Sequence, residues 1–186
     1  MIANYPSISN YLSNIVFITG GTKSGKSELA EYLAKGSKNL AYIALSENTI
    51  EDKAWQEKII LHRKRRPKEW ILIETTDLLN TLTKEQGPLL IDSIGGFVME
   101  SIEREQNEWV AKMNSLIGLL KKRKSKTFIV GEQVGWSLVS EYKIGNTYIE
   151  RIGELQKKIT KISNDNWLAI NGRAIKIDEI SIEIPI

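Results

Sequence analysis

Short apolar runs alternate with segments of helical periodicity along most of this chain of 186 residues. A short apolar run bounded by turn-forming residues is typical of a buried strand. Five such strands are predicted, at Asn14–Thr19, Leu40–Leu45, Trp70–Glu74, Leu89–Asp92 and Thr127–Val130. Strands that alternate with helices favour an α/β fold built around a mostly parallel sheet.

Helices are predicted in the segments between these strands. The first runs to about Lys35, and the second starts at Ser46–Thr49 and runs towards His62. The second helix must end before Pro67, because proline disfavours a helical residue before it. A short helix follows the potential capping residues Thr75-Thr76-Asp77.

A single long helix is predicted after Gly95-Gly96. Its buried face is marked by helix-spaced apolar residues, Trp109, Met113, Leu116, Ile117 and Leu120. The basic run Lys121–Lys124 ends the helix, where cations suit the helix dipole. We interpret this run as a solvated helix end rather than a nucleic-acid patch, because no aromatic residue is interleaved with it.

The last part of the chain is predicted as a loop, a helix and a hairpin. The loop spans Gly131–Ser140, and the helix buries a face made of Tyr148, Ile152, Leu155, Ile159 and Ile162. Two closing strands, Trp167–Ile170 and Ala174–Ile177, flank Asn171-Gly172. Asn-Gly between apolar runs is a strong signal for a hairpin.

Composition narrows the class of protein. Hydrophobic residues make up 41% and charged residues 26% of the chain, which is ordinary for a globular protein. We expect one domain at residues 14–186, after an N-terminal extension at residues 1–13. The sequence predicts no membrane span and no signal peptide. A net charge of +3 is too small to argue for nucleic acid. The absence of cysteine excludes disulfides and thiolate chemistry and agrees with a cytoplasmic location.

The strongest motif is Gly20-Gly21-Thr22-Lys23-Ser24-Gly25-Lys26-Ser27, between the first strand and the first helix. This G-x-x-x-x-G-K-S pattern in a strand–loop–helix context predicts a phosphate-binding loop. Its glycines let backbone N–H groups surround an anion, and the helix adds its dipole. Lys26 can reach the β- and γ-phosphates, and the Ser27 hydroxyl can ligate Mg²⁺. The fold is therefore predicted to be P-loop NTPase-like, with a bound nucleoside triphosphate.

Asp92 ends an apolar strand and is a candidate second ligand for Mg²⁺. The acidic partner of a phosphate-binding loop stands at such a position and holds the metal directly or through water. An ordinary strand-ending aspartate that caps the next helix is the alternative. The loop upstream favours the metal site.

His62, the chain's only histidine, lies in the basic stretch Leu61–Pro67. One interpretation is a surface histidine in a basic turn. The other is a nucleophile or acid–base group near triphosphate oxygens, with the neighbouring cations lowering the histidine pKa and keeping a nitrogen lone pair free. Attack on an α-phosphate would give a phosphoramidate that carries a nucleotidyl group.

These residues resemble the bifunctional adenosylcobinamide kinase / adenosylcobinamide-phosphate guanylyltransferase family of cobalamin biosynthesis. The loop is similar to the family's T-G-G-x-R/K-S-G-K-S, and Tyr42-Ile43-Ala44 to its Y-I-A. The spacing I-x-x-H-x-x-x-R-P-x-x-W-x-x-x-E is the more specific match, carried by Ile59, His62, Arg66, Pro67, Trp70 and Glu74. The resemblance covers residues 14–177.

The resemblance implies two reactions. ATP or GTP phosphorylates the aminopropanol hydroxyl of adenosylcobinamide, and GMP then passes from GTP to the product through a guanylylated histidine, which would be His62. The loop would hold the triphosphate, with Lys26 in catalysis. The implied guanine-nucleotide contacts are Ala44, Leu45, Ser46, Arg63, Lys64, Arg65, Arg66 and Glu74. A homo-oligomer, in the form of a trimer, is also implied.

The chain departs from the family pattern near its C-terminal end. The family's N-E-V-G is here Glu132-Gln133-Val134-Gly135, which loses an acid at Gln133. The segment Asn146–Lys157 lacks two arginines and an asparagine of the pattern. Two alternatives therefore stay open: a P-loop small-molecule kinase with one activity, and a non-catalytic nucleotide-binding partner.

Overall fold

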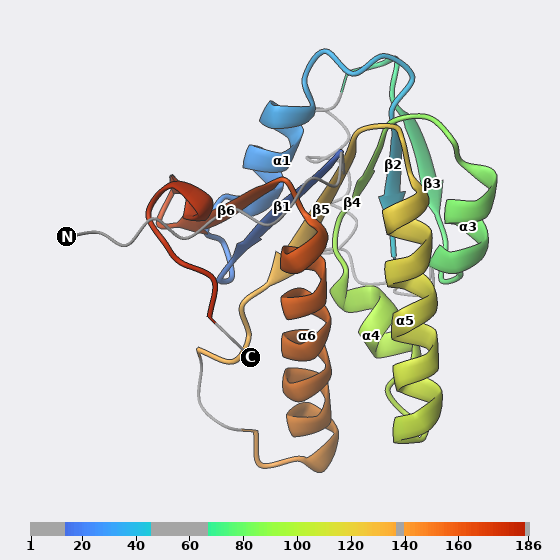
Figure 1. Cartoon of the computed structure of the whole chain (residues 1–186), viewed down its shortest axis with the longest axis vertical. Helices are drawn as coiled ribbons and strands as arrows, with labels where there is room; N and C mark the ends of the chain where they lie inside the picture. Colours follow the sequence, from blue (N-terminus) through green and yellow to red (C-terminus); the bar gives the residue numbers. More distant parts are fainter. Residues whose placement is uncertain (1–13, 46–66, 137–139, 185–186) are drawn as a thin grey trace, which may run out of the picture.

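The computed structural model describes residues 14–45, 67–136 and 140–184. Within these ranges seven strands form one sheet, in the order β3-β2-β4-β5-β1-β6-β7 (Figure 1). The strands are β1 (Ile15–Gly20), β2 (Ala41–Ala44), β3 (Ile71–Glu74), β4 (Leu89–Ile91), β5 (Thr127–Glu132), β6 (Asp165–Ile170) and β7 (Arg173–Lys176). Neighbouring strands run parallel except β6 and β7, which are antiparallel. The predicted α/β fold and closing hairpin are confirmed.

Helices cover both faces of this sheet. They are α1 (Lys26–Ala34), α3 (Leu78–Lys84), α4 (Gly95–Glu100), α5 (Gln106–Lys122) and α6 (Lys143–Ile162), and a 3₁₀ turn, η1, spans Ile177–Glu179. Residues from α3, α4, α5 and α6 share one buried cluster, and residues from α1 share the other. In Figure 1, α5 and α6 stand side by side against the sheet.

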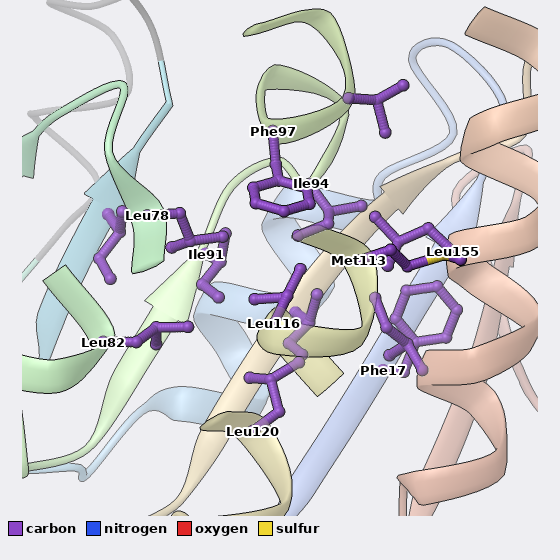
Figure 2. Packing of buried hydrophobic residues seen from close by; sticks show 14 of the residues in the cluster. Phe17, Leu78, Leu82, Ile91, Ile94, Phe97, Met113, Leu116, Leu120 and Leu155 are labelled. Carbon is purple, nitrogen blue, oxygen red and sulfur yellow. The ribbon is translucent and has the colours of Figure 1, made fainter. Parts of the chain in front are cut away.

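The two-residue period of the strands divides the core between these faces. In β1, Ile15 and Phe17 belong to the cluster under α3–α6, whereas Val16 and Ile18 belong to the cluster under α1. Figure 2 shows Phe17 meeting Met113 of α5 and Leu155 of α6 in the larger cluster. Apolar burial on both faces explains why the central strands read as continuous apolar runs.

The strands predicted from apolar runs lie within two residues of their observed bounds, and two details need correction. Strand β5 continues through Gly131 and Glu132, which pair with Thr19 and Gly20, so these residues do not belong to the predicted loop. Ile177 starts the 3₁₀ turn rather than ending the last strand. Among helices in the described ranges, none combines the length and apolarity that a bilayer crossing needs.

The predicted single long helix after Gly95-Gly96 is wrong, because the chain breaks it into α4 and α5. Ser101 ends α4 and is fully buried, with its hydroxyl donating to the Phe97 carbonyl at 3.0 Å. Buried Arg151 of α6 donates to the carbonyls of Ser101 at 2.6 Å and Arg104 at 2.6 Å. A capping box between Glu105 and Glu108 then starts α5. The guanidinium therefore satisfies the carbonyls freed at the break.

The predicted solvated end of this helix also needs correction at one residue. Lys121, Lys122 and Lys124 are exposed, but Arg123 is only 9% exposed. Its guanidinium donates to the carbonyls of Glu85 and Gly87 and, at 3.0 Å, to Thr127 Oγ1. Arg123 thus ties the end of α5 to the turn between α3 and β4 and to the start of β5.

Candidate nucleotide-binding site

The glycine-rich loop joins β1 to α1 at the carboxyl edge of the sheet, as the sequence predicts. Lys23 has φ of 55° and Gly25 has φ of 96°, so the loop turns twice through left-handed backbone. Helix α1 begins directly afterwards, and the Leu29 N–H donates to the Gly25 carbonyl at 2.9 Å. The N–H groups of the first helical turn have no partner within the helix. Together with the helix dipole they suit an anion in front of the loop.

The β6–β7 hairpin supports this loop from the side. The Gly172 N–H donates to the Ser24 carbonyl at 3.0 Å. Gly20 lies so close to β6 that a Cβ there would stand 2.6 Å from Ser24 Oγ and closer still to the Ala169 carbonyl oxygen. Only glycine fits at residue 20 without moving one of these neighbours. The sequence predicts the hairpin but gives no sign that its turn contacts the loop.

Lys26, Ser27 and Asp92, which the sequence predicts to act together, lie together. The Lys26 ammonium donates to the Gly21 carbonyl at 3.1 Å, and Ser27 Oγ donates to Asp92 Oδ1 at 3.1 Å. The Tyr42 hydroxyl donates to Asp92 Oδ2. Asp92 does not cap the next helix, whose N-cap is Ile94, so that alternative is wrong. A hydroxyl and a carboxylate are the oxygen donors that Mg²⁺ prefers, and the pair fits this ion.

A third carboxyl group, Glu132, belongs to the same site and was not predicted. Strand β5 lies between β1 and β4, so its last residue stands between the loop and Asp92. The Ser93 hydroxyl donates to Glu132 Oε1. Burial raises the pKa of Glu132, and the Ser93 hydrogen bond and the charge of Lys26 oppose that rise. Because the sequence predicts a loop that starts at residue 131, Glu132 was not identified as a site residue.

The raised pKa of Glu132 predicts how stability depends on pH. The folded protein binds the Glu132 proton more tightly than the unfolded chain, whose carboxyl has the ordinary pKa of 4.5. The free-energy cost of burying the ionised Glu132 carboxylate is therefore absent below pH 4.5. This cost grows as the pH rises to the folded-state pKa and is constant above it. We expect Glu132→Gln to melt at a higher temperature than the wild type at pH 8, with the difference shrinking at pH 4. Melting curves without nucleotide or magnesium measure this, and an equal difference at both pH values would contradict it.

Three further predicted contacts lie on the same edge of the sheet but farther from the loop. Ala44 ends β2 and pairs with Glu74 at the end of β3. Leu45 packs on α4, where a Cβ on Gly96 would stand 2.5 Å from Leu45 Cβ. With strands about 4.8 Å apart, Ala44 is about 14 Å and Glu74 about 19 Å from β1 across the sheet. These residues can reach only the part of a nucleotide that is remote from the loop.

The remaining predicted site residues are Ser46, His62, Arg63, Lys64, Arg65 and Arg66, and they lie outside the described residues. The predicted helix between Ser46 and His62 and the N-terminal extension, residues 1–13, also lie there. Of the predicted nucleotide contacts, the loop, Ala44, Leu45, Glu74 and Asp92 therefore lie within the described residues.

A buried polar network lies behind the loop and was also missed. Thr19 Oγ1 donates to Gln156 Oε1 at 3.0 Å, and Gln133 Nε2 donates to Thr19 Oγ1 at 2.9 Å. Gln156 Nε2 donates to the Glu132 carbonyl at 2.7 Å. Gln133 and Gln156, which both replace residues of the family pattern, also contact each other directly, with Gln133 Nε2 donating to Gln156 Oε1 at 3.2 Å. The hydrogen bonds of this network connect α6 to β1, the strand that precedes the loop.

The fold and this loop define the chain as a P-loop nucleotide-binding protein. Solved structures of two ATPases share the fold. A prototypical ATPase of the type III secretion system of pathogenic bacteria has a TM-score of 0.50 and 12% identity, covering 87% of this chain and 56% of that one. The assembled ATPase EscN of enteropathogenic Escherichia coli, in complex with its stalk EscO, has a TM-score of 0.52 and 14% identity, covering 83% and 41%. The chain thus spans about half the length of these ATPases or less.

Sequence comparison identifies the family. The chain belongs to the cobinamide kinase / cobinamide phosphate guanyltransferase family, whose model matches residues 16–177. It is 25% identical to the bifunctional adenosylcobalamin biosynthesis protein CobU of Escherichia coli, covering 88% of this chain and 99% of that protein. It is 26% identical to CobU of Salmonella typhimurium over the same shares. The bifunctional protein CobP of Pseudomonas aeruginosa is 28% identical, covering 77% and 86%. The resemblance inferred from the motifs is confirmed.

Proposed function

We propose that this chain catalyses two successive steps of adenosylcobalamin biosynthesis. In the first, ATP or GTP phosphorylates the aminopropanol hydroxyl of adenosylcobinamide. In the second, GMP from GTP is joined to the adenosylcobinamide phosphate, which gives adenosylcobinamide-GDP and releases pyrophosphate. The family match over residues 16–177 supports both steps, since the family is one of cobinamide kinases and cobinamide phosphate guanyltransferases.

The observation that carries the proposal is the grouping of Lys26, Ser27 and Asp92 at the loop. Backbone N–H groups of the loop and the Lys26 ammonium would hold the β- and γ-phosphates of the nucleotide. These donors are fixed before the reaction and would stabilise the negative charge that develops on the leaving nucleoside diphosphate or pyrophosphate. The same cradle would serve both steps, because nucleoside diphosphate leaves in the first and pyrophosphate leaves in the second.

Ser27 and Asp92 would hold Mg²⁺ when the nucleotide is bound. Their oxygens already lie 3.1 Å apart, and a third oxygen donor, the Tyr42 hydroxyl, orients the Asp92 carboxylate. The bound ion neutralises phosphate charge and acts as a Lewis acid. The chain's own part is to orient the carboxylate and the hydroxyl at the mouth of the loop.

His62 would be the nucleophile that carries GMP. Support comes from the sequence, in which His62, Arg66 and Glu74 keep the spacing of the family pattern. The imidazole nitrogen would bond to the α-phosphorus of GTP while the bond from that phosphorus to the α,β-bridging oxygen breaks and pyrophosphate leaves. Adenosylcobinamide phosphate would then take the GMP group from the histidine.

Labelling with GTP that carries ³²P at the α-phosphate tests the proposal. We expect magnesium-dependent, acid-labile label on the wild-type protein and no label on His62→Ala. His62→Ala is still expected to bind GTP and to phosphorylate cobinamide, because the loop is unchanged. Lys64→Ala is the matched control from the same basic stretch, and it should keep at least part of the label.

The outcomes separate the proposal from its alternatives. Label that persists on His62→Ala would assign the nucleophile to another residue. Wild-type protein that phosphorylates cobinamide without ever becoming labelled would be a kinase with one activity. Binding of GTP without either reaction would indicate a non-catalytic nucleotide-binding partner. A homo-oligomer, in the form of a trimer, stays a prediction from the family resemblance, and sedimentation of the purified protein tests it. A cytoplasmic location stays a prediction from the sequence composition.

A further inference from the structure

Glu132 lies between the phosphate-binding loop and Asp92 in the candidate nucleotide site. Its strand, β5, pairs with β1 on one side and β4 on the other (Figure 1). Glu132 is in register with Gly20, which opens the phosphate-binding loop. On the other side it reaches Ser93, the residue after Asp92. A carboxylate is thus placed beside the point where the terminal phosphate of a bound nucleotide would lie.

One oxygen of this carboxyl group has no hydrogen-bond donor within the described residues. Glu132 Oε1 accepts from the Ser93 hydroxyl, whereas Oε2 is buried and unpaired. A buried carboxylate oxygen without a donor costs free energy, and a donor on a bound molecule is one way to offset that cost. The charged and titratable groups that act on this carboxyl are Lys26, Asp92 and Tyr148.

The Glu132 carboxyl group is closely packed against the first turn of α4 and the Tyr148 hydroxyl. A Cβ on Gly95, at the start of α4, would stand 2.8 Å from each Glu132 carboxylate oxygen and nearer to the Tyr148 hydroxyl. Gly95 and the Tyr148 side chain cover the Glu132 carboxyl group, and the Tyr148 side chain is the flexible one of the two. Glycine at residue 95 thus lets the Glu132 carboxylate and the Tyr148 hydroxyl pack against the first turn of α4, and the Tyr148 side chain has to move before an acceptor hydroxyl can reach Glu132 Oε2.

We propose that Glu132 is a catalytic residue of the kinase step, the base that takes the proton of the acceptor hydroxyl. This inference rests on the proposed function, because it needs an alcohol as acceptor. The alcohol oxygen forms a bond to the γ-phosphorus, and the bond from that phosphorus to the β,γ-bridging oxygen breaks. The hydroxyl proton passes to Glu132 Oε2, and nucleoside diphosphate leaves with the bridging oxygen and its electron pair.

The raised pKa of the Glu132 carboxyl group suits the role of base. A carboxyl group with an ordinary pKa is a weak base near neutral pH, and burial raises the pKa of Glu132 towards that range. Lys26 would be occupied by the phosphates of the nucleotide, which removes its opposing influence. The GMP step needs no such base, since an imidazole nitrogen and a phosphate are its nucleophiles. Glu132 therefore serves one of the two steps only.

A purely structural role, in which Glu132 only holds Ser93, predicts a different pattern. Glutamine at residue 132 keeps an oxygen that accepts from the Ser93 hydroxyl, but it cannot take a proton. Ser93→Ala removes the hydrogen bond and leaves the carboxylate in place. The two variants thus separate the base from the structural contact, and the stability prediction made above shows whether Glu132→Gln is folded.

The experiment measures both half-reactions on wild type, Glu132→Gln, Glu132→Asp and Ser93→Ala. We expect Glu132→Gln to lower the kcat of cobinamide phosphorylation by about 10²-fold or more. Its affinity for ATP and its labelling with α-³²P GTP should stay within about threefold of wild type. Glu132→Asp should recover part of the kcat, and Ser93→Ala should lose less than about tenfold.

Two results would overturn the proposal and leave the proposed function standing. One is a Glu132→Gln enzyme with a wild-type kcat for phosphorylation. The other is an equal loss of phosphorylation and guanylylation in Glu132→Gln, matched by Ser93→Ala, which would indicate a structural contact. The wild-type enzyme in the same assays tests the proposed function by itself, so the two kinds of failure are distinguishable.

Discussion

Lys26→Ala is expected to lower the rate of cobinamide phosphorylation by about 10²- to 10³-fold or more. Removing one fixed donor from the place where charge develops costs about this much in other enzymes. Here the lost donor is also a full positive charge, on the first residue of α1, where backbone N–H groups and the helix dipole already attract the phosphates. The backbone cradle alone cannot neutralise the leaving nucleoside diphosphate. Steady-state assay of cobinamide phosphate formation measures the effect.

The same substitution at Lys23 is the matched control. Lys23 lies in the same loop but is exposed. Its backbone φ is 55°, and alanine suits this angle as well as lysine does. We expect Lys23→Ala to change the rate by less than about tenfold, because an exposed cation is screened by solvent. Equal losses in both variants would show that the loop responds to charge in general rather than to the Lys26 ammonium. An unchanged rate in Lys26→Ala would refute the assigned role.

Arg123→Met is expected to lower the free energy of unfolding by about 2–4 kcal/mol. The guanidinium supplies donors to the carbonyls of Glu85 and Gly87 and to Thr127 Oγ1. Methionine keeps much of the volume but leaves these acceptors without a partner, and an unsatisfied buried acceptor costs about 1–3 kcal/mol. The effect is on folding, since Arg123 lies at the far end of α5 from the site. Equilibrium unfolding in urea measures it.

Lys122→Met provides the comparison, because Lys122 is the exposed neighbour at the same helix end. Loss of its charge from the last turn of α5 should cost less than about 1 kcal/mol. If the two variants unfold at the same urea concentration, the buried guanidinium contributes no more to the free energy of unfolding than an exposed lysine does, and the prediction is wrong. Nucleotide affinity should be close to the wild-type value in both.

Local patterns in the sequence predicted the parts of the structure that depend on local physics. The apolar runs identify the central strands because both faces of the sheet are covered, so nearly every residue of β1 is buried. Ser27 and Asp92 could be paired from sequence because parallel strands end at one edge of a sheet. The closing turn followed from Asn171 and Gly172, which both have the positive φ that a two-residue hairpin needs.

The parts that sequence patterns missed depend on partners far away in the chain. Arg151 and Gln156 are buried polar residues on α6, and periodicity assigns such residues to the surface. Their partners are a helix break about 50 residues earlier and the strand that carries the loop. Glu132 was assigned to a loop because the apolar run that predicts β5 is followed by Gly131 and two polar residues, Glu132 and Gln133. Only the pairing of Glu132 with Gly20 shows that the strand continues.

The hydrogen bond from Gly172 to Ser24 has a consequence for biosynthesis of the protein itself. The anion cradle is made at residues 20–27, yet the backbone that braces it is made only at Gly172. A contact of such long sequence separation forms late, because its loop-closure entropy is repaid only after the intervening sheet has assembled. A nascent chain therefore has the loop glycines long before Gly172 has been made, and the loop reaches its braced form only after the hairpin has formed.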